Sequence, residues 1–192
     1  MSEVERKSID SLLAFHGAPT LLGVKCANLI SFDRNDCIIA EYLDKFKYRL
    51  SENGLTAVQL CICRKRTLVY FYNPKMLTAW LSMPQVQQFL SEYGYTCDMS
   101  IEQKLRRLSS RISCGSFPHE IGAFLGYPVE DIRGFISNGG KNCLLCGYWK
   151  VYGNAEKAQR TFNKYDRCRD ILFDKLKSGL DLFQAISKEE NI

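Results

Sequence analysis

Apolar residues recur at intervals of three and four along several segments, which is the pattern of amphipathic helices. The clearest such segment begins at Asp36, and its apolar positions are Ile39, Tyr42 or Leu43, Phe46 and Leu50. It stops at Gly54, and glycine is the residue favoured just past a helix end. We therefore predict a helix that starts at Asp36 and ends before Gly54.

Further helices are expected over residues 4–15 and in segments that start near Pro74, Pro84, Ser100 and Asn154. Proline is tolerated in a first helical turn, which explains two of these starts. Ser100 and Gln103 have the spacing of a capping box. Asn154 is a favourable N-cap, and Gly179 lies beyond the end of the long apolar stripe that follows it.

Other segments carry the β-branched and aromatic residues that suit a pleated, half-buried surface. LTAVQLCIC and TLVYFY flank the basic turn RKR at Arg64 to Arg66 and predict a β-hairpin. Alternation along its first strand would place Val58, Leu60 and Ile62 on one face, and Cys61 and Cys63 on the other. APTLLGVKCANLISF turns through Pro19 and Gly23 into a strand-like run, and GYWKVYG is expected to form a short strand.

Helices outnumber strands, so we predict an α+β fold. Its small mixed or antiparallel sheet consists of the hairpin near residues 55–72 plus one or two further strands, covered by several helices. The 192 residues are 46% hydrophobic, enough for one compact core, and no Pro/Gly/Ser-rich spacer or repeat interrupts them. We therefore expect a single domain over residues 1–192, with a frayed polar tail at 187–192.

The N-terminal segment MSEVERKSID lacks a basic region followed by an apolar run, and no apolar stretch approaches the roughly 18 residues of a membrane span. We expect a soluble, cytoplasmic protein without membrane association. Nine cysteines, an odd number, predict reduced thiols rather than a disulfide framework. The net charge of +5 favours anionic partners.

FPHEIGAFLGYPVEDIRGFI has the apolar and glycine spacing of a helix-turn-helix, with Gly122, Gly126 and Ile132 at the small, turn and apolar positions. DNA binding is disfavoured, because Glu130 and Asp131 in the second helix would repel phosphate. Attraction to phosphate would have to come from a nearby basic cluster, which consists of Lys104, Arg106, Arg107 and Arg111. A helix-turn-helix DNA-binding protein that uses residues 122–137 stays open as an alternative.

His119 and Glu120 combine an imidazole that titrates near neutral pH with a carboxylate, the ingredients of acid–base chemistry. Cys143 and Cys146 have the spacing of a zinc knuckle or a thioredoxin-like pair. They run from a loop into a strand, however, and no second pair has suitable spacing. We expect no metal site and identify no cofactor, and a thiol enzyme with Cys143 as nucleophile and His119 as base is the second alternative.

Four segments together resemble a known family, namely APTLLGVKCANLISF, FPHEIGAFLGYPVEDIRGFI, GYWKVYG and AQRTFNKYDRC. The family is an uncharacterised one from anaerobic bacteria, domain of unknown function 3793, and the similarity extends from His16 to the last helix. This resemblance implies a stand-alone cytoplasmic protein and carries over no activity. It also implies an accessory role in iron or redox metabolism, with a redox protein as partner.

Two departures from the family pattern bear on mechanism. Relatives often have a cysteine directly after the histidine that corresponds to His16, where this chain has Gly17. If that thiol were a nucleophile, this chain would be inactive or would use another group. Cys143 matches the family pattern whereas Cys146 does not, which weakens a paired redox or zinc role.

The polar residues that match the family are Lys25, His119, Glu120, Lys150 and Tyr152. We expect them at the ends of strands and the start of a helix, where ligand clefts tend to form. We predict a cleft shared by the PTLLGVK, PHE and WKVY segments that binds an anionic small molecule, with His119, Glu120 and Cys143 as candidate catalytic residues. In the architectural alternative, Lys25 and Lys150 extend to water from a sheet edge and Glu120 pairs with one of them.

Overall fold

The computed structural model describes residues 1–33, 36–62, 66–112 and 117–187. The chain divides into two compact units, of which the first comprises Met1–Pro74 and Tyr165–Ile192 and the second Lys75–Lys164. The expectation of a single domain over residues 1–192 stays a prediction. Of the predicted polar tail, residues 188–192 lie outside the described part of the chain.

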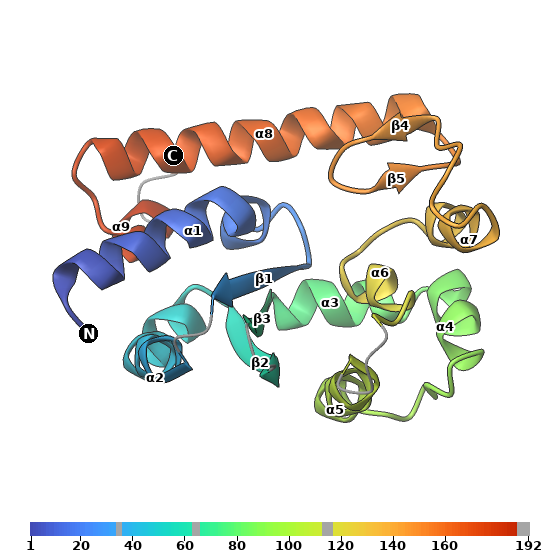
Figure 1. Cartoon of the computed structure of the whole chain (residues 1–192), viewed down its shortest axis with the longest axis horizontal. Coiled ribbons are helices and arrows are strands. Elements are labelled where there is room, and N and C mark those ends of the chain that lie inside the picture. Colours follow the sequence, from blue (N-terminus) through green and yellow to red (C-terminus); the bar gives the residue numbers. More distant parts are fainter. Residues whose placement is uncertain (34–35, 63–65, 113–116, 188–192) are drawn as a thin grey trace. The chain divides into compact units, whose positions relative to one another are not determined.

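The first unit is built on a three-stranded antiparallel sheet in the order β1-β3-β2 (Figure 1). Its strands are β1 (Ala27–Asp33), β2 (Thr56–Ile62) and β3 (Arg66–Tyr72). Helix α1 (Glu3–Leu21) packs on β1, and α2 (Asp36–Glu52) packs on β2. The second half of α8 (Ala155–Lys177) and the short α9 (Leu182–Ile186) complete this unit.

One face of the sheet contributes to the apolar core of the first unit. Ile30 of β1 lies opposite Val69 of β3, and these two side chains are buried together with Phe32 and Phe71 on the same face. They share one cluster with residues of α1, α2, α8 and α9, among them Leu13, Tyr42, Leu172 and Phe183. Burial of each large apolar side chain contributes about 1.5–3 kcal/mol, so this cluster is the main source of the unit's stability.

The second unit is mostly helical and ends in a small hairpin. Its elements are α3 (Pro74–Leu81), α4 (Pro84–Ser91), α5 (Ile101–Ile112), α6 (Ile121–Phe124), α7 (Val129–Ser137), β4 (Leu145–Cys146), β5 (Lys150–Val151) and the first half of α8. Helix α7 packs against β5 (Figure 1). Val151 of β5 forms a small core with Ala158 and Phe162 of α8.

The described residues thus form nine helices and two small antiparallel sheets, and the predicted α+β class is confirmed. The hairpin, which corresponds to β2 and β3, is confirmed as well. Within the ranges that the structure covers, no helix is both long and apolar enough to cross a lipid bilayer.

Helix ends that depend on local signals lie where the sequence places them. The Ser100 amide donates to Gln103 Oε1 at 2.7 Å, and the Gln103 amide donates to Ser100 Oγ at 3.2 Å, which is the predicted capping box. Asn154 Oδ1 accepts a hydrogen bond from the Lys157 amide at 2.8 Å and caps α8. Gly54 follows α2 with a φ of +69°.

The first helix is longer than the sequence predicted. The expected end at residue 15 is wrong, because α1 continues to Leu21 with Pro19 inside it. Proline normally interrupts a helix, since it lacks an N–H. Here Pro19 and its neighbours on both sides are buried, so packing of the last turn outweighs the lost hydrogen bond. The turn comes later, at Gly23, whose φ is +70°.

Strict alternation along β2 is also wrong. The register shifts between Gln59 and Cys61, which pair with adjacent residues of β3. Leu60 is therefore the extra residue of a β-bulge, and such an insertion reverses the side to which the following residues point. Cys61 lies on the same face as Val58, not on the opposite one. Outside the described residues lie Cys63, Arg64 and Lys65.

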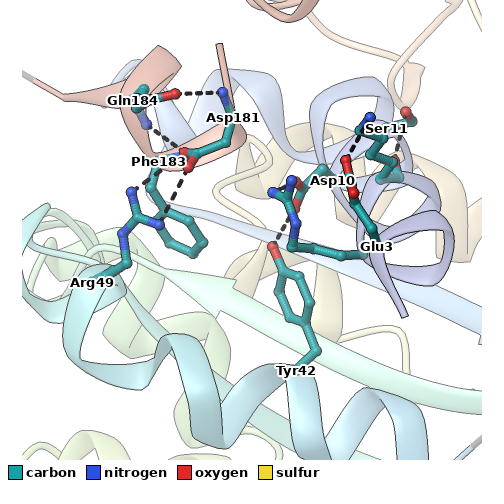
Figure 2. A network of polar contacts seen from close by, with 10 residues as sticks. Glu3, Asp10, Ser11, Tyr42, Arg49, Asp181, Phe183 and Gln184 are labelled. Carbon is teal, nitrogen blue, oxygen red and sulfur yellow. Dashed lines mark hydrogen bonds and ion pairs between the residues drawn. The ribbon is translucent and has the colours of Figure 1, made fainter. Parts of the chain in front are cut away.

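A buried carboxylate links α1 to α2 in the first unit (Figure 2). Asp10 is 4% exposed, accepts a hydrogen bond from the Tyr42 hydroxyl at 2.7 Å and pairs with Arg6 at 2.9 Å. Close by, Arg49 of α2 pairs with Asp181, the N-cap of α9, at 3.3 Å. Burial raises the pKa of Asp10 above its ordinary value of 3.8, although the Tyr42 hydroxyl and the Arg6 charge oppose the shift.

We predict that Asp10 makes the protein less stable as the pH rises from 3.8 through the raised pKa of the folded state. In that range the folded protein holds a proton that the unfolded chain has released, so the free energy of unfolding falls with increasing pH. Urea unfolding of the wild type and of Asp10→Asn across this range gives the difference between their free energies of unfolding. This difference, wild type minus variant, should fall with increasing pH and then level off.

Tyr42→Phe supplies a second arm of this experiment. Loss of the hydroxyl that stabilises the charged Asp10 raises the pKa of Asp10 further, so the fall should extend to higher pH in this variant. A difference between wild type and Asp10→Asn that is flat or rises over the range would contradict the assignment.

Candidate functional site

The second unit contains a pocket of about 300 Å³ formed by the segment before α6, by α7 and by the β5 hairpin. Its lining is mostly apolar and aromatic: Phe117, Pro118, Ile121, Gly122, Tyr127, Ile132, Phe135 and Trp149. Three ionisable side chains complete it, namely His119, Asp131 and Lys150. Two of the segments predicted from the sequence to share a cleft, PHE and WKVY, therefore meet at one pocket.

Asp131 is the structural centre of this pocket. It lies in the first turn of α7, is 3% exposed and accepts three hydrogen bonds. Its Oδ2 accepts from the Trp149 indole N–H at 2.7 Å, and its Oδ1 accepts from the amides of Tyr152 and Gly153 at 2.7 and 2.8 Å. The positive end of the helix dipole also favours a carboxylate at this position. Asp131 thereby ties α7 to the hairpin across the pocket.

Aromatic packing forms the pocket wall. The Tyr127 and Trp149 rings stack with their centres 5.1 Å apart, and Trp149 meets Phe162 edge-on at 4.6 Å. The Tyr127 hydroxyl donates to the Tyr148 carbonyl at 3.1 Å, so its polar tip is used inside the protein. A Cβ at Gly122 would lie 2.9 Å from Ile132, so only glycine lets α6 approach α7 this closely.

An ammonium and an imidazole lie close to one aromatic ring. The Lys150 ammonium is 5.9 Å from the centre of the Phe135 ring and donates to the Gly140 carbonyl at 2.6 Å. The exposed His119 imidazole lies 5.7 Å from the same ring. These contacts hold the ammonium and the imidazole beside an apolar surface, where an anion would be weakly hydrated.

Glu120 is fully buried but does not line the pocket. One of its carboxylate oxygens forms an ion pair with Arg111 and accepts from the Tyr95 hydroxyl at 3.4 Å. The other oxygen, Oε2, has no hydrogen-bond donor among the described residues. The architectural alternative that pairs Glu120 with Lys25 or Lys150 is therefore wrong in its choice of partner, because Arg111 takes that place.

Lys25, the predicted ligand residue of the PTLLGVK segment, belongs to the first compact unit. It is 4% exposed, and burial lowers its pKa to about 8. Its ammonium lies 5.8 Å from the centre of the Tyr165 ring in the same unit. A lysine buried to this extent does not fit the alternative in which it extends to water from a sheet edge.

Tyr152 contributes to the frame around the pocket rather than to its lining. Its amide donates to Asp131, and its hydroxyl donates to the Lys141 carbonyl at 3.0 Å. The ring packs on Gly134 of α7, where a Cβ would lie 2.4 Å from the ring. This contact explains a glycine in the middle of a helix, which otherwise costs about 1 kcal/mol relative to alanine.

Cys146 belongs to β4, and Cys143 lies two residues before that strand. Cys143 is half-buried and Cys146 is exposed, and both are free thiols. Desolvation raises the pKa of the Tyr152 hydroxyl, and the charges of these two cysteines raise it further, so both lie near that side chain. Cys143 does not line the pocket that His119 lines. In the described part of the chain, no three His, Cys, Asp or Glu side chains gather as a metal site would require.

The basic cluster on α5 is largely engaged within the protein. Lys104 donates to the Met99 carbonyl, Arg107 donates to the Tyr93 carbonyl at 2.8 Å, and Arg111 pairs with Glu120. Helices α6 and α7 correspond to the predicted helix-turn-helix, and α6 is a single turn of four residues. Binding of phosphate by Arg111 would compete with its ion pair to Glu120, which adds a cost to the DNA-binding alternative.

Sequence reasoning missed three residues that build the pocket: Tyr127, Asp131 and Phe135. From the sequence alone, Asp131 counts only as a charge that would repel DNA. Its presence near the start of a predicted helix, a position that favours acidic residues, was the signal that could have marked it as structural.

We predict that Asp131→Ala lowers the free energy of unfolding of the second unit by about 3 kcal/mol, because three N–H donors lose their acceptor. The control is the adjacent, exposed Glu130, and Glu130→Ala should change the free energy of unfolding by less than about 0.5 kcal/mol. Urea unfolding followed by tryptophan fluorescence measures both. Equal, small effects of the two substitutions would show that Asp131 does not hold the hairpin.

Comparison with known proteins agrees with the resemblance that the sequence motifs carry. A search of curated proteins and a search of solved structures each found no match. A family model described as "Protein of unknown function (DUF3793)" matches residues 13–186, which covers both compact units. The chain therefore belongs to the DUF3793 family.

Proposed function

We propose that the second unit binds a small organic anion in the pocket beside His119 and Lys150. The observation that carries this function is a mostly apolar pocket of about 300 Å³, with aromatic rings in its wall and an ammonium and an imidazole at its edge. Ligand pockets of proteins typically combine an apolar lining with a few polar groups that orient the ligand, and this volume is at the lower end of their range.

Lys150 supports an anionic ligand by its fixed position. One of its three N–H groups is used by the Gly140 carbonyl, and this bond holds the ammonium over Phe135. A charge-assisted hydrogen bond from a positioned ammonium is about twice as strong as one between neutral groups. The low polarity of the neighbouring rings strengthens the attraction further.

A cationic ligand fits this pocket less well. Asp131 is its only carboxylate among the described lining residues, and both of its oxygens already accept N–H donors from the hairpin. A ligand ammonium would compete with three internal hydrogen bonds, whereas an anion meets Lys150 without displacing any.

The proposed accessory role in iron or redox metabolism, with a redox protein as partner, rests on family context alone.

We predict that the anionic, largely aromatic probe naphthalene sulfonate binds the protein saturably, and that Lys150→Met weakens its binding about tenfold. His119→Ala should weaken it by a smaller factor. Fluorescence titration measures the dissociation constant. The melting temperature of each variant should stay within a few degrees of the wild type, since Lys150 makes one hydrogen bond and His119 is exposed.

Lys141→Met is the matched control. It removes the same charge from an exposed lysine nine residues away that does not line the pocket. Equal weakening by Lys141→Met and Lys150→Met would mean that only net charge matters, and the proposed site would be wrong. Duplex DNA binding that falls steeply with salt and is lost in Arg106→Glu would favour the DNA-binding alternative instead.

A further inference from the structure

We propose that the natural ligand of this pocket is a monocarboxylate with a flat aromatic body of one or two rings. This assignment rests on the function proposed above and adds the chemical class of the ligand. It follows from three properties of the pocket: the polarity of its wall, the number of positive groups at its edge and its volume.

The wall offers ring surfaces and few polar atoms. Two of its aromatic residues have a polar tip, and both tips are used internally: the Trp149 indole donates to Asp131 and the Tyr127 hydroxyl donates to the Tyr148 carbonyl. A sugar or another polyhydroxylated body would leave its own hydroxyl groups unpaired against this wall, at a cost for each group. A flat ring instead can stack or pack edge-on against Trp149 and Phe135.

The edge supplies donors for one negative charge. Lys150 retains N–H groups beyond the one that Gly140 accepts, and an imidazole offers an N–H in either protonation state. Two donors from two side chains match the two oxygens of one carboxylate. Lysine also binds phosphate, but phosphate sites usually add arginine or clustered backbone amides. Arg133 of α7 is already paired with Glu92, and Arg111 of α5 is paired with Glu120.

The carboxylate of Asp131 does not oppose this arrangement strongly. Three N–H dipoles from the hairpin point at its oxygens, and they offset much of its field. The volume of about 300 Å³ also limits the ligand. It accommodates a single or fused double ring with one head group, but it is small for a nucleotide or a dinucleotide cofactor.

Three probes with one body and different head groups test this class: naphthoate, naphthamide and naphthyl phosphate. Isothermal titration of the full chain at neutral pH should give naphthoate an affinity about tenfold higher than the neutral amide, the gain expected from one charge-assisted contact. The affinity for naphthoate should also exceed the affinity for naphthyl phosphate. In Lys150→Met the preference of naphthoate over naphthamide should disappear, while Lys141→Met should retain it.

The possible failures are distinguishable. If none of the three probes binds, the pocket function proposed above is wrong. If the amide or the phosphate binds as tightly as naphthoate, the pocket takes ligands but the carboxylate class is wrong. Lys150→Met could also lose the preference for naphthoate over naphthamide because it misfolds. His119→Gln guards against this, because it leaves Lys150 and its bond to Gly140 intact. It should reduce the preference for naphthoate only in part.

Discussion

A buried carboxylate with three N–H donors holds the second unit of this protein in its shape. Asp131 joins the first turn of α7 to the indole of Trp149 and to the chain that leaves β5. The β4–β5 hairpin is too short to be stable by itself, since two-stranded ribbons are marginal in water. Asp131 fixes Trp149 relative to α7 together with the packing of Tyr152 on Gly134, and the pocket depends on that placement.

Charge pairing decides which basic groups remain for a ligand. The chain carries a formal charge of +5, which by itself favours anionic partners of any size. In the second unit, however, Arg111 and Arg133 are paired with glutamates, and Lys104 and Arg107 donate to carbonyl groups. Lys150 also donates to a carbonyl, but its ammonium lines the apolar pocket. Overall charge therefore says less about the partner than the position of this one ammonium.

The sequence predicts those features that depend on neighbouring residues. The capping box at Ser100 and the N-cap at Asn154 are local signals, and both are present. Features that depend on distant residues were missed or wrong. Pro19 lies inside a helix because its surroundings are buried, and the bulge at Leu60 reflects pairing with β3. The three donors of Asp131 come from residues 149–153, so no local pattern around α7 reveals them.

The most direct test of this account is a proton–nitrogen NMR titration with naphthoate, in which the two tryptophan indoles are observed separately. Trp149 lines the pocket and donates to Asp131, whereas Trp80 donates to the Ala123 carbonyl and does not line it. The account predicts a large, saturable shift of the Trp149 indole signal with a much smaller change at Trp80. A titration that leaves the Trp149 signal in place, or that moves only the Trp80 signal, would contradict it.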